Sequence, residues 1–178
     1  MTEADYEQVY ALWLGTPGMG LNNIDDSNDG ISKYLARNPS TCFVAEADNE
    51  LGSVDGVGVG DVDNASSDVG GGACSSVGGG ADNDVGIIVG VILSGHDGRR
   101  GYIHHTAVAE SEQRRGIGAA LLDAAMDALK REGITKVALL VFGANEKGNV
   151  FWEKHGFTIR PDLIYRNKAI VDLTRIDT

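Results

Sequence analysis

The sequence predicts a single domain of the α/β or α+β class, and three observations support this prediction. The chain has 178 residues, which suits one domain with a hydrophobic core of its own. Segments with helical periodicity alternate with short segments typical of strands. Apolar residues make up 42% of the chain, yet no run approaches the roughly 20 residues that span a bilayer. We therefore expect a soluble protein without a membrane partner.

The predicted elements follow one another in a regular order. Apolar periodicity and end signals such as Pro39 and Gly133 predict helices at residues 3–14, 30–38, 116–132 and 146–155. β-branched and apolar runs predict strands at residues 41–47, 87–94, 101–108, 135–142, 157–160 and 163–171. The turn signal Asp97-Gly98 joins two of these strands into a hairpin.

One stretch, residues 52–86, has a different composition. Gly, Ser, Asp, Asn, Ala and Val dominate it, and it contains no Lys, Arg or aromatic residue. Such a segment buries too little surface to offset its ordering entropy, so we expect a flexible insertion within one domain at 1–178. Its calcium-loop-like fragments sustain no period. A second calcium-like segment begins at Asp25 but has Ala36 where a calcium loop needs Glu, so we expect no metal.

The charge balance narrows the choice of partners. The net charge is −11, with 26 acidic against 15 basic residues, which argues against nucleic acid. This excess of acid either favours cationic substrates or gives a halophile-like surface that keeps the protein soluble in a salty cytoplasm. The acidic start of the chain lacks the pattern of an export signal, so we expect a cytoplasmic location. Cys42 and Cys74 are expected to be free thiols.

A glycine-containing loop between a strand and a helix is the clearest chemical signal. It reads Gln113-Arg114-Arg115-Gly116-Ile117-Gly118-Ala119. Its glycines let the backbone approach a ligand closely, and the N–H groups of the helix start face an anion. Leu121 stands where a dinucleotide-binding loop has Gly or Ala, and the Gly-Lys-Ser/Thr of a Walker loop is absent. The loop alone also fits a turn that merely starts a helix.

Two segments together resemble the GCN5-related N-acetyltransferase (GNAT) superfamily. The loop, following Thr106-Ala107-Val108, resembles the acetyl-CoA motif of that family. The run Asn145-Glu146-Lys147-Gly148-Asn149-Val150-Phe151-Trp152-Glu153-Lys154-His155-Gly156-Phe157 resembles a second family motif. Together they cover roughly residues 87–168, whereas the first 50 residues match only in general pattern.

The resemblance implies a fold and a mode of coenzyme binding. The fold is a mixed central sheet with helices on both faces, and its usual first strand is short or missing here. Two parallel strands, ending near Val108 and Phe142, would part so that the pantetheine arm of acetyl-CoA lies between them. The implied coenzyme contacts are Ala107, Val108, Gln113, Arg114, Arg115, Gly116, Ile117, Gly118, Ala119 and Asn145. Asn145 fits a helix N-cap equally well, and the two roles are compatible.

The catalytic residues are where this sequence departs from its relatives. Trp152 occupies the position where many members have a Tyr general acid, and Leu140 the position of a Glu base in ribosomal-protein relatives. Register with the family instead makes His104 the candidate base, with Tyr102 beside it. Strand alternation would place His105 on the opposite face, where it packs or reaches solvent. A structural role for His104 stays open, and Tyr165 is a reserve acid.

These observations predict an N-acetyltransferase that needs no metal. An acetyl group would pass from acetyl-CoA to a primary amine by direct attack. The amine belongs to a small molecule or to a peptide or protein N-terminus, since an α-amine is easier to deprotonate than a lysine. The alternative is a non-catalytic acyl-CoA-binding module, which the residues at 140 and 152 would allow. A homodimer is left open.

Overall fold

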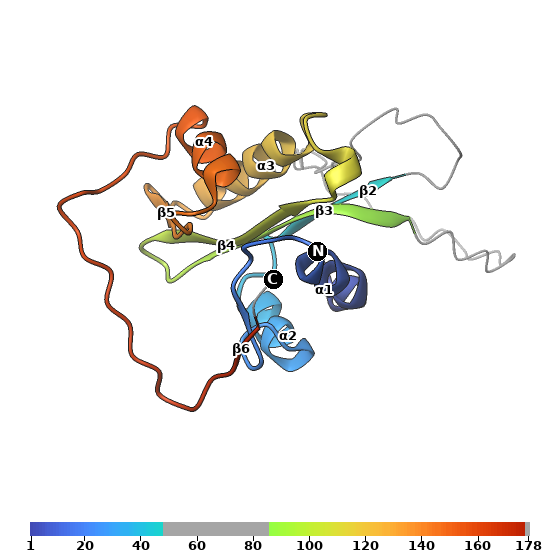
Figure 1. Cartoon of the computed structure of the whole chain (residues 1–178), viewed down its shortest axis with the longest axis horizontal. Coiled ribbons are helices and arrows are strands. Elements are labelled where there is room, and N and C mark those ends of the chain that lie inside the picture. The colour runs from blue at the N-terminus through green and yellow to red at the C-terminus, as the bar shows by residue number, and fades with distance from the viewer. Residues whose placement is uncertain (48–85, 177–178) are drawn as a thin grey trace, which may run out of the picture.

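The structure, a computed structural model, describes residues 1–47 and 86–176, and it places helices on both faces of a central sheet (Figure 1). On one face lie α1 (Tyr6–Leu14), preceded by the short 3₁₀ turn η1 (Glu3–Asp5), and α2 (Asn28–Arg37). On the other lie α3 (Ile117–Arg131) and α4 (Glu146–Lys154). The predicted insertion at 52–86 lies outside the described residues, apart from Gly86.

The central sheet has four strands in the order β2-β3-β4-β5. They are β2 (Phe43–Ala47), β3 (Ile87–His96), β4 (Gly101–Val108) and β5 (Val137–Leu139). The first three are antiparallel, whereas β4 and β5 are parallel. The β3–β4 hairpin turns where predicted, because Gly98 adopts a φ of 87° and the Asp97 carboxylate accepts from the N–H groups of Arg99 and Arg100. The predicted mixed sheet is thus confirmed.

Each face of the sheet packs against its helices in a separate core. Val9 and Trp13 of α1 are fully buried against the face that carries Val91. The opposite core joins α3 to Ile92 and Ile103. Both clusters are built from residues at the spacings that predicted the elements, since a helix buries one stripe and a strand alternate side chains. No helix in the described part of the chain is long and apolar enough to cross a membrane.

A buried group of polar residues near the start of β2 links this part of the chain to β3. Thr41 and Ser94 exchange side-chain hydrogen bonds with each other's carbonyl oxygens. Cys42, next in the chain, donates from its Sγ to the Ser94 carbonyl at 3.1 Å. Burial raises the pKa of the Cys42 thiol to about 11, so the thiol stays protonated and inert near neutral pH, as expected for a free cysteine. Cys74 lies outside the described residues.

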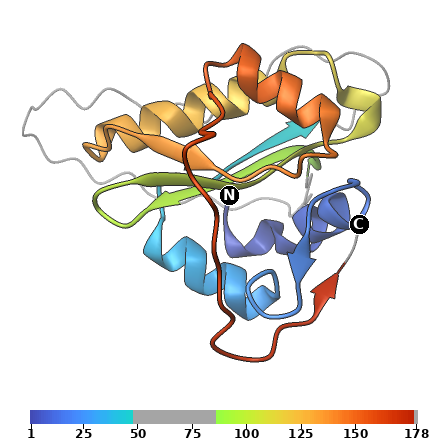
Figure 2. The ribbon, with the colours of Figure 1, turned by 60° about the vertical axis from the view of Figure 1, so that its left-hand side comes forward.

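The last part of the chain corrects the sequence prediction. Strands predicted at 157–160 and 163–171 do not form, and residues 157–174 run past the sheet without a ladder partner (Figure 2). The final strand, β6 (Arg175–Ile176), instead pairs antiparallel with β1 (Leu21–Asn22). The edge strand β5 pairs over only three residues, so it offers little backbone for further strands to join. Apolar and β-branched residues alone therefore did not produce strands here.

The usual first strand of the family was predicted to be short or missing, and the structure agrees with this prediction. β1 is two residues long, lies between α1 and α2 in the chain, and belongs to a separate two-stranded sheet. The central sheet of the described residues begins with β2. The α1/α2 side is therefore bordered by the loop that links the two helices, and this loop reaches the middle of β4.

Candidate active site

A cleft opens where β4 and β5 part. The two strands pair from Gly101 with Val137 to Ile103 with Leu139, after which β5 ends and β4 continues to Val108. The predicted strand at 135–142 is therefore shorter than expected, because residues 140–142 have left β4. The cleft between them is lined by Gly18, Met19, Ile103, His104, His105, Thr106, Leu139, Leu140, Val141, Phe142, Asn145 and Trp152.

A β-bulge in β4 decides which side chains face which helices. His105 pairs with Leu93 of β3, and Ile103 pairs with the next residue, Ser94, so His104 is an extra residue in β4. Residues paired across an antiparallel ladder share a face, and Leu93 belongs to the α1/α2 core. The bulge therefore turns His105 to the same side as His104. The prediction that these two histidines lie on opposite faces is wrong, because strict alternation does not survive an inserted residue.

His104 lies between the cleft and a second pocket. Its ring stands edge-on to Tyr34 of α2, with ring centroids 5.4 Å apart, and lies 6.1 Å from the ring of Tyr102. Desolvation by these neighbours lowers the pKa of His104 below its ordinary value, and the nearby His105 acts in the same direction. The second pocket has a volume of about 170 Å³ and is lined by Tyr34, Arg37, Asn38, Gly95, His96, Asp97, Tyr102 and His104.

His105 is held by a carboxylate that the sequence did not point to. Its Nε2 lies 2.7 Å from Oδ1 of Asp26, and both side chains are largely buried, 12% and 6% exposed. The Trp13 ring lies against the imidazole, with centroids 4.9 Å apart. Asp26 and His105 are 79 positions apart in the chain. Only the fold brings them together, and no spacing rule would have paired them.

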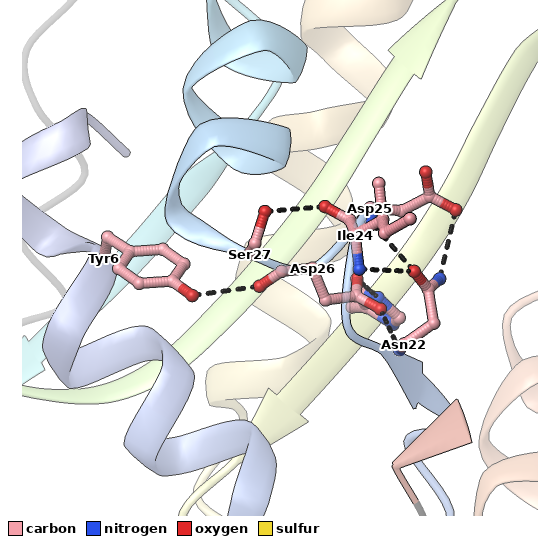
Figure 3. A network of polar contacts seen from close by, with 7 residues as sticks. Tyr6, Asn22, Ile24, Asp25, Asp26 and Ser27 are labelled. Carbon is pink, nitrogen blue, oxygen red and sulfur yellow. Dashed lines mark hydrogen bonds and ion pairs between the residues drawn. The ribbon is translucent and has the colours of Figure 1, made fainter. Parts of the chain in front are cut away.

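The loop that carries Asp26 is fixed by a network of its own (Figure 3). The second oxygen of Asp26, Oδ2, accepts from the backbone N–H of Asn22 at 2.7 Å, and its main-chain carbonyl accepts from the Tyr6 hydroxyl at 3.0 Å. The side-chain oxygen of Asn22 accepts from the N–H groups of Ile24 and Asp25. Every contact restrains the loop at the position of Asp26, so this aspartate is held in place beside β4.

The predicted coenzyme loop begins beside the end of β4. Two of its residues have left-handed backbones, Arg114 with a φ of 65° and Gly116 with a φ of 89°. The side-chain amide of Gln113 donates to the Val108 carbonyl at 3.2 Å, and this hydrogen bond connects the loop to the strand. Helix α3 begins at Ile117, so its first N–H groups lie directly after the turn. Arg115 is paired with Glu112 at 2.6 Å, so Arg114 is the better candidate for a phosphate contact.

The remaining motif residues lie on α4. Asn145 caps this helix, and its side-chain oxygen accepts from the Gly148 N–H at 2.9 Å, so the N-cap role is observed. Trp152 lines the cleft and packs edge-on against Phe151 and Phe157. An indole N–H cannot act as a general acid, so Trp152 contributes only to the shape of the cleft. Tyr165, the reserve acid, lies in the exposed segment 157–174 and does not line the cleft.

The geometry thus defines a class of protein: an α+β domain with a split in its sheet and a left-handed turn that starts a helix beside the end of β4. The chain belongs to the acetyltransferase (GNAT) family, whose sequence model matches residues 6–157. It is 35% identical over 75 residues to a mycothiol acetyltransferase of Beutenbergia cavernae, a match that covers 42% of this chain and 25% of that protein.

Two further comparisons agree with this assignment. An acetyltransferase of Sodalis glossinidius is 29% identical over 87 residues, a match that covers 49% of this chain and 61% of that protein. The matches thus span less than two thirds of either relative. The crystal structure of Ard1 from Thermoplasma volcanium has the same fold, with a TM-score of 0.57 at 19% identity, covering 90% of this chain and 80% of that one.

Proposed function

We propose that this protein transfers an acetyl group from acetyl-CoA to a primary amine by direct attack. The observation that carries the proposal is the position of His104, which borders both the split in the sheet and the neighbouring pocket. An acetyl donor in the split and an amine entering from the pocket would meet at this residue. Family membership supports the same reaction class.

The donor would lie along the split between β4 and the residues after β5. Its pyrophosphate would bind the N–H groups of Ile117, Gly118 and Ala119 at the start of α3, where the helix dipole favours an anion. Arg114 would add charge from the turn. The pantetheine arm would follow the backbone of Ala107 and Val108, displacing the weak, exposed Gln113 contact to the Val108 carbonyl.

The backbone would also stabilise the reaction itself. The N–H of Val108 would face the thioester carbonyl and favour the oxyanion of the tetrahedral intermediate. Asn145 would hold the pantetheine end of the coenzyme from the first turn of α4. These contacts use main-chain groups and an amide already fixed as a helix cap, so they need little rearrangement on binding.

His104 would accept the proton of the attacking amine, with Tyr102 beside it. A general base must be unprotonated, and the lowered pKa of His104 keeps the imidazole neutral to lower pH than an ordinary histidine. Deprotonating a lysine at pH 7 costs about 4.6 kcal/mol, against about 1 kcal/mol for an α-amine. A histidine of lowered basicity therefore suits a peptide or protein N-terminus, or a small amine of low pKa.

We also infer a cytoplasmic setting of high salt from the net charge of −11, and a homodimer stays a prediction. Thiol release from acetyl-CoA, measured with a panel of amines at high and low salt, tests the function. Calorimetry with acetyl-CoA provides the parallel measurement. We expect binding together with amine-dependent thiol release. Binding without thiol release would instead favour a non-catalytic acyl-CoA-binding module, for which Trp152 and Leu140 would be the reason.

A further inference from the structure

We propose that Asp26 and His105 form a second acid–base pair, in which His105 gives a proton to the sulfur of the departing coenzyme. The inference rests on the proposed acetyl transfer. It assigns the general-acid role that Trp152 cannot perform to a histidine on the opposite side of the cleft. Asp26 is a positioning residue in this scheme, since its carboxylate bonds His105 and the Asn22 N–H of its own loop.

The first argument is that the pair is buried and completely oriented. Asp26 uses one carboxylate oxygen on the Asn22 N–H and the other on His105, each at 2.7 Å. A carboxylate that is 6% exposed is costly unless it is paired with charge and hydrogen bonds. A His105 that carries protons on both nitrogens makes the pair neutral overall. The Trp13 ring, 4.9 Å away between centroids, restrains the tilt of the imidazole.

The second argument concerns which nitrogen exchanges its proton. An ionised carboxylate only accepts hydrogen bonds. Nε2 of His105 therefore keeps its proton and donates it in a hydrogen bond to Asp26. The proton that His105 exchanges is therefore the one on Nδ1. His105 is one of the residues that line the cleft, where the thioester would lie. Asp26 thus fixes the tautomer and the orientation at once.

The proton balance of the step is simple. The amine nitrogen attacks the thioester carbon and forms the C–N bond, and its surplus proton goes to His104. The C–S bond breaks, the sulfur keeps the electron pair, and it takes the proton from Nδ1 of His105. The products are an amide and a free thiol. His104 then holds one proton more and His105 one fewer, and exchange with water restores both.

The charges around the two histidines favour this division of roles. The groups that face them are Asp26 and Asp25 from the loop and the two imidazoles themselves, with Trp13 and Tyr34 as neutral neighbours. A charged His105 disfavours a second charge on His104, which lies next to it in β4. His104 is thereby kept neutral and able to accept a proton.

The first test is direct and needs no turnover. Nitrogen NMR of the imidazoles reports which ring nitrogen carries the proton. We expect the neutral form of His105 to be protonated on Nε2 in the wild type. In Asp26→Asn the amide donates to Nε2, so the proton moves to Nδ1. Asp25→Asn is the matched control, because Asp25 bonds Asn22 and does not touch His105. A neutral wild-type His105 that carries its proton on Nδ1 instead of Nε2 would overturn the pair.

The second test separates acid catalysis from a structural role by changing the leaving group. His105→Gln and Asp26→Asn should each lower kcat with acetyl-CoA by about 10²-fold while the KM for acetyl-CoA changes little. With p-nitrophenyl acetate, whose leaving group needs no proton, both should stay within about 3-fold of wild type, and His104→Gln should lose activity with both donors. Asp25→Asn removes a charge near His104 but no bond to His105, so any change it causes should be the same with both donors.

The outcomes distinguish this inference from the proposed function. An active wild type whose activity His105→Gln leaves unchanged, or lowers equally with both donors, overturns the acid role of His105 alone. A wild type that binds acetyl-CoA but transfers acetyl to no amine overturns the proposed function and the acid role together. If Asp26→Asn unfolds, His105→Gln decides, since it leaves the Asn22 contact to Asp26 in place.

Discussion

The coenzyme loop and the histidine side of β4 meet the same strand but are built in different ways. The loop is seven consecutive residues, 113–119, and the contacts proposed for it are mostly made by its backbone. The histidine side joins Asp26 and Tyr34 to two histidines of β4, and it works through side chains brought together from distant positions. A local backbone site tolerates changes around it, whereas an assembled side-chain site depends on every element that holds it.

The largest expected effect comes from the histidine side. His104→Gln should lower kcat/KM by about 10² to 10⁴-fold and leave acetyl-CoA affinity nearly unchanged, because a general base is lost and no coenzyme contact is touched. In the wild type, activity should fall as pH drops through the pKa of His104, which lies below the ordinary histidine value. The variant should lose this acidic limb. Steady-state kinetics between pH 5 and 8 measures both effects.

A matched histidine substitution sharpens this prediction. His155 stacks on Phe151 at the end of α4 and does not line the cleft. His155→Gln should therefore leave the pH profile unchanged. His105→Gln cannot serve as a neutral control, because the bulge turns His105 to the same side as His104. Equal small effects from His104→Gln and His155→Gln would remove His104 from the mechanism.

The next effect tests how the Asp26 loop is held. A Cβ at Gly30 would overlap the carbonyl oxygens of Ile24 and Asp25, which are backbone atoms and cannot rotate away. Gly30→Ala should lower the free energy of unfolding by about 1 to 3 kcal/mol and displace Asp26 from His105. Urea denaturation measures the first effect. Gly143→Ala is the control, since its Cβ would meet nothing within 4 Å. Equal stability of the two variants would show that the loop yields easily.

A smaller effect, of opposite sign for stability and binding, is expected at the coenzyme loop. Arg114 is the one non-glycine residue in the described chain with a positive φ, a conformation that costs roughly 1 to 2 kcal/mol. Arg114→Gly should relieve part of this cost and stabilise the fold by about 1 kcal/mol. Its affinity for acetyl-CoA should fall about 10-fold through the lost phosphate contact. Thermal melts and calorimetry measure the two quantities.

The neighbouring arginine is the comparison for that variant. Arg115 is already paired with Glu112, so Arg115→Ala should weaken acetyl-CoA binding less than Arg114→Gly does. If the order of the two is reversed, the phosphate contact belongs to Arg115. Unchanged affinity in both variants would place the pyrophosphate elsewhere.

The smallest effect is expected from shortening the chain between β2 and β3. Ala47 and Ile87 are partners in the antiparallel ladder, so a short Asn-Gly turn can join the strands once residues 52–85 are removed. Gly86 should be kept, because its carbonyl accepts from the Gln8 side chain. Stability and acetyl-CoA affinity should both stay close to the wild-type values. If circular dichroism shows that the shortened chain is unfolded, the deleted residues have a structural role.

Predictions from the sequence held where one segment carried its own signal. β4 has the predicted bounds, 101–108, and the Asp97-Gly98 turn forms the hairpin. The predictions were wrong where a strand forms only if a neighbouring strand pairs with it. Residues 163–171 are rich in apolar and β-branched side chains but have no ladder partner, and β5 stops at Leu139, after which residues 140–142 no longer pair with β4. The coenzyme contacts and the catalytic role of His104 remain predictions.

The sequence by itself determined the family and the order of the helices and of the central-sheet strands, because each depends on consecutive residues and their periodicity. Only the tertiary structure decided the surroundings of the histidines. A single inserted residue in β4 turned His105 toward α1, and a loop 79 positions earlier supplied its carboxylate. A bulge changes the register with a neighbouring strand, and an ion pair requires two distant segments to meet. Neither can therefore be predicted from the residue spacing within one segment.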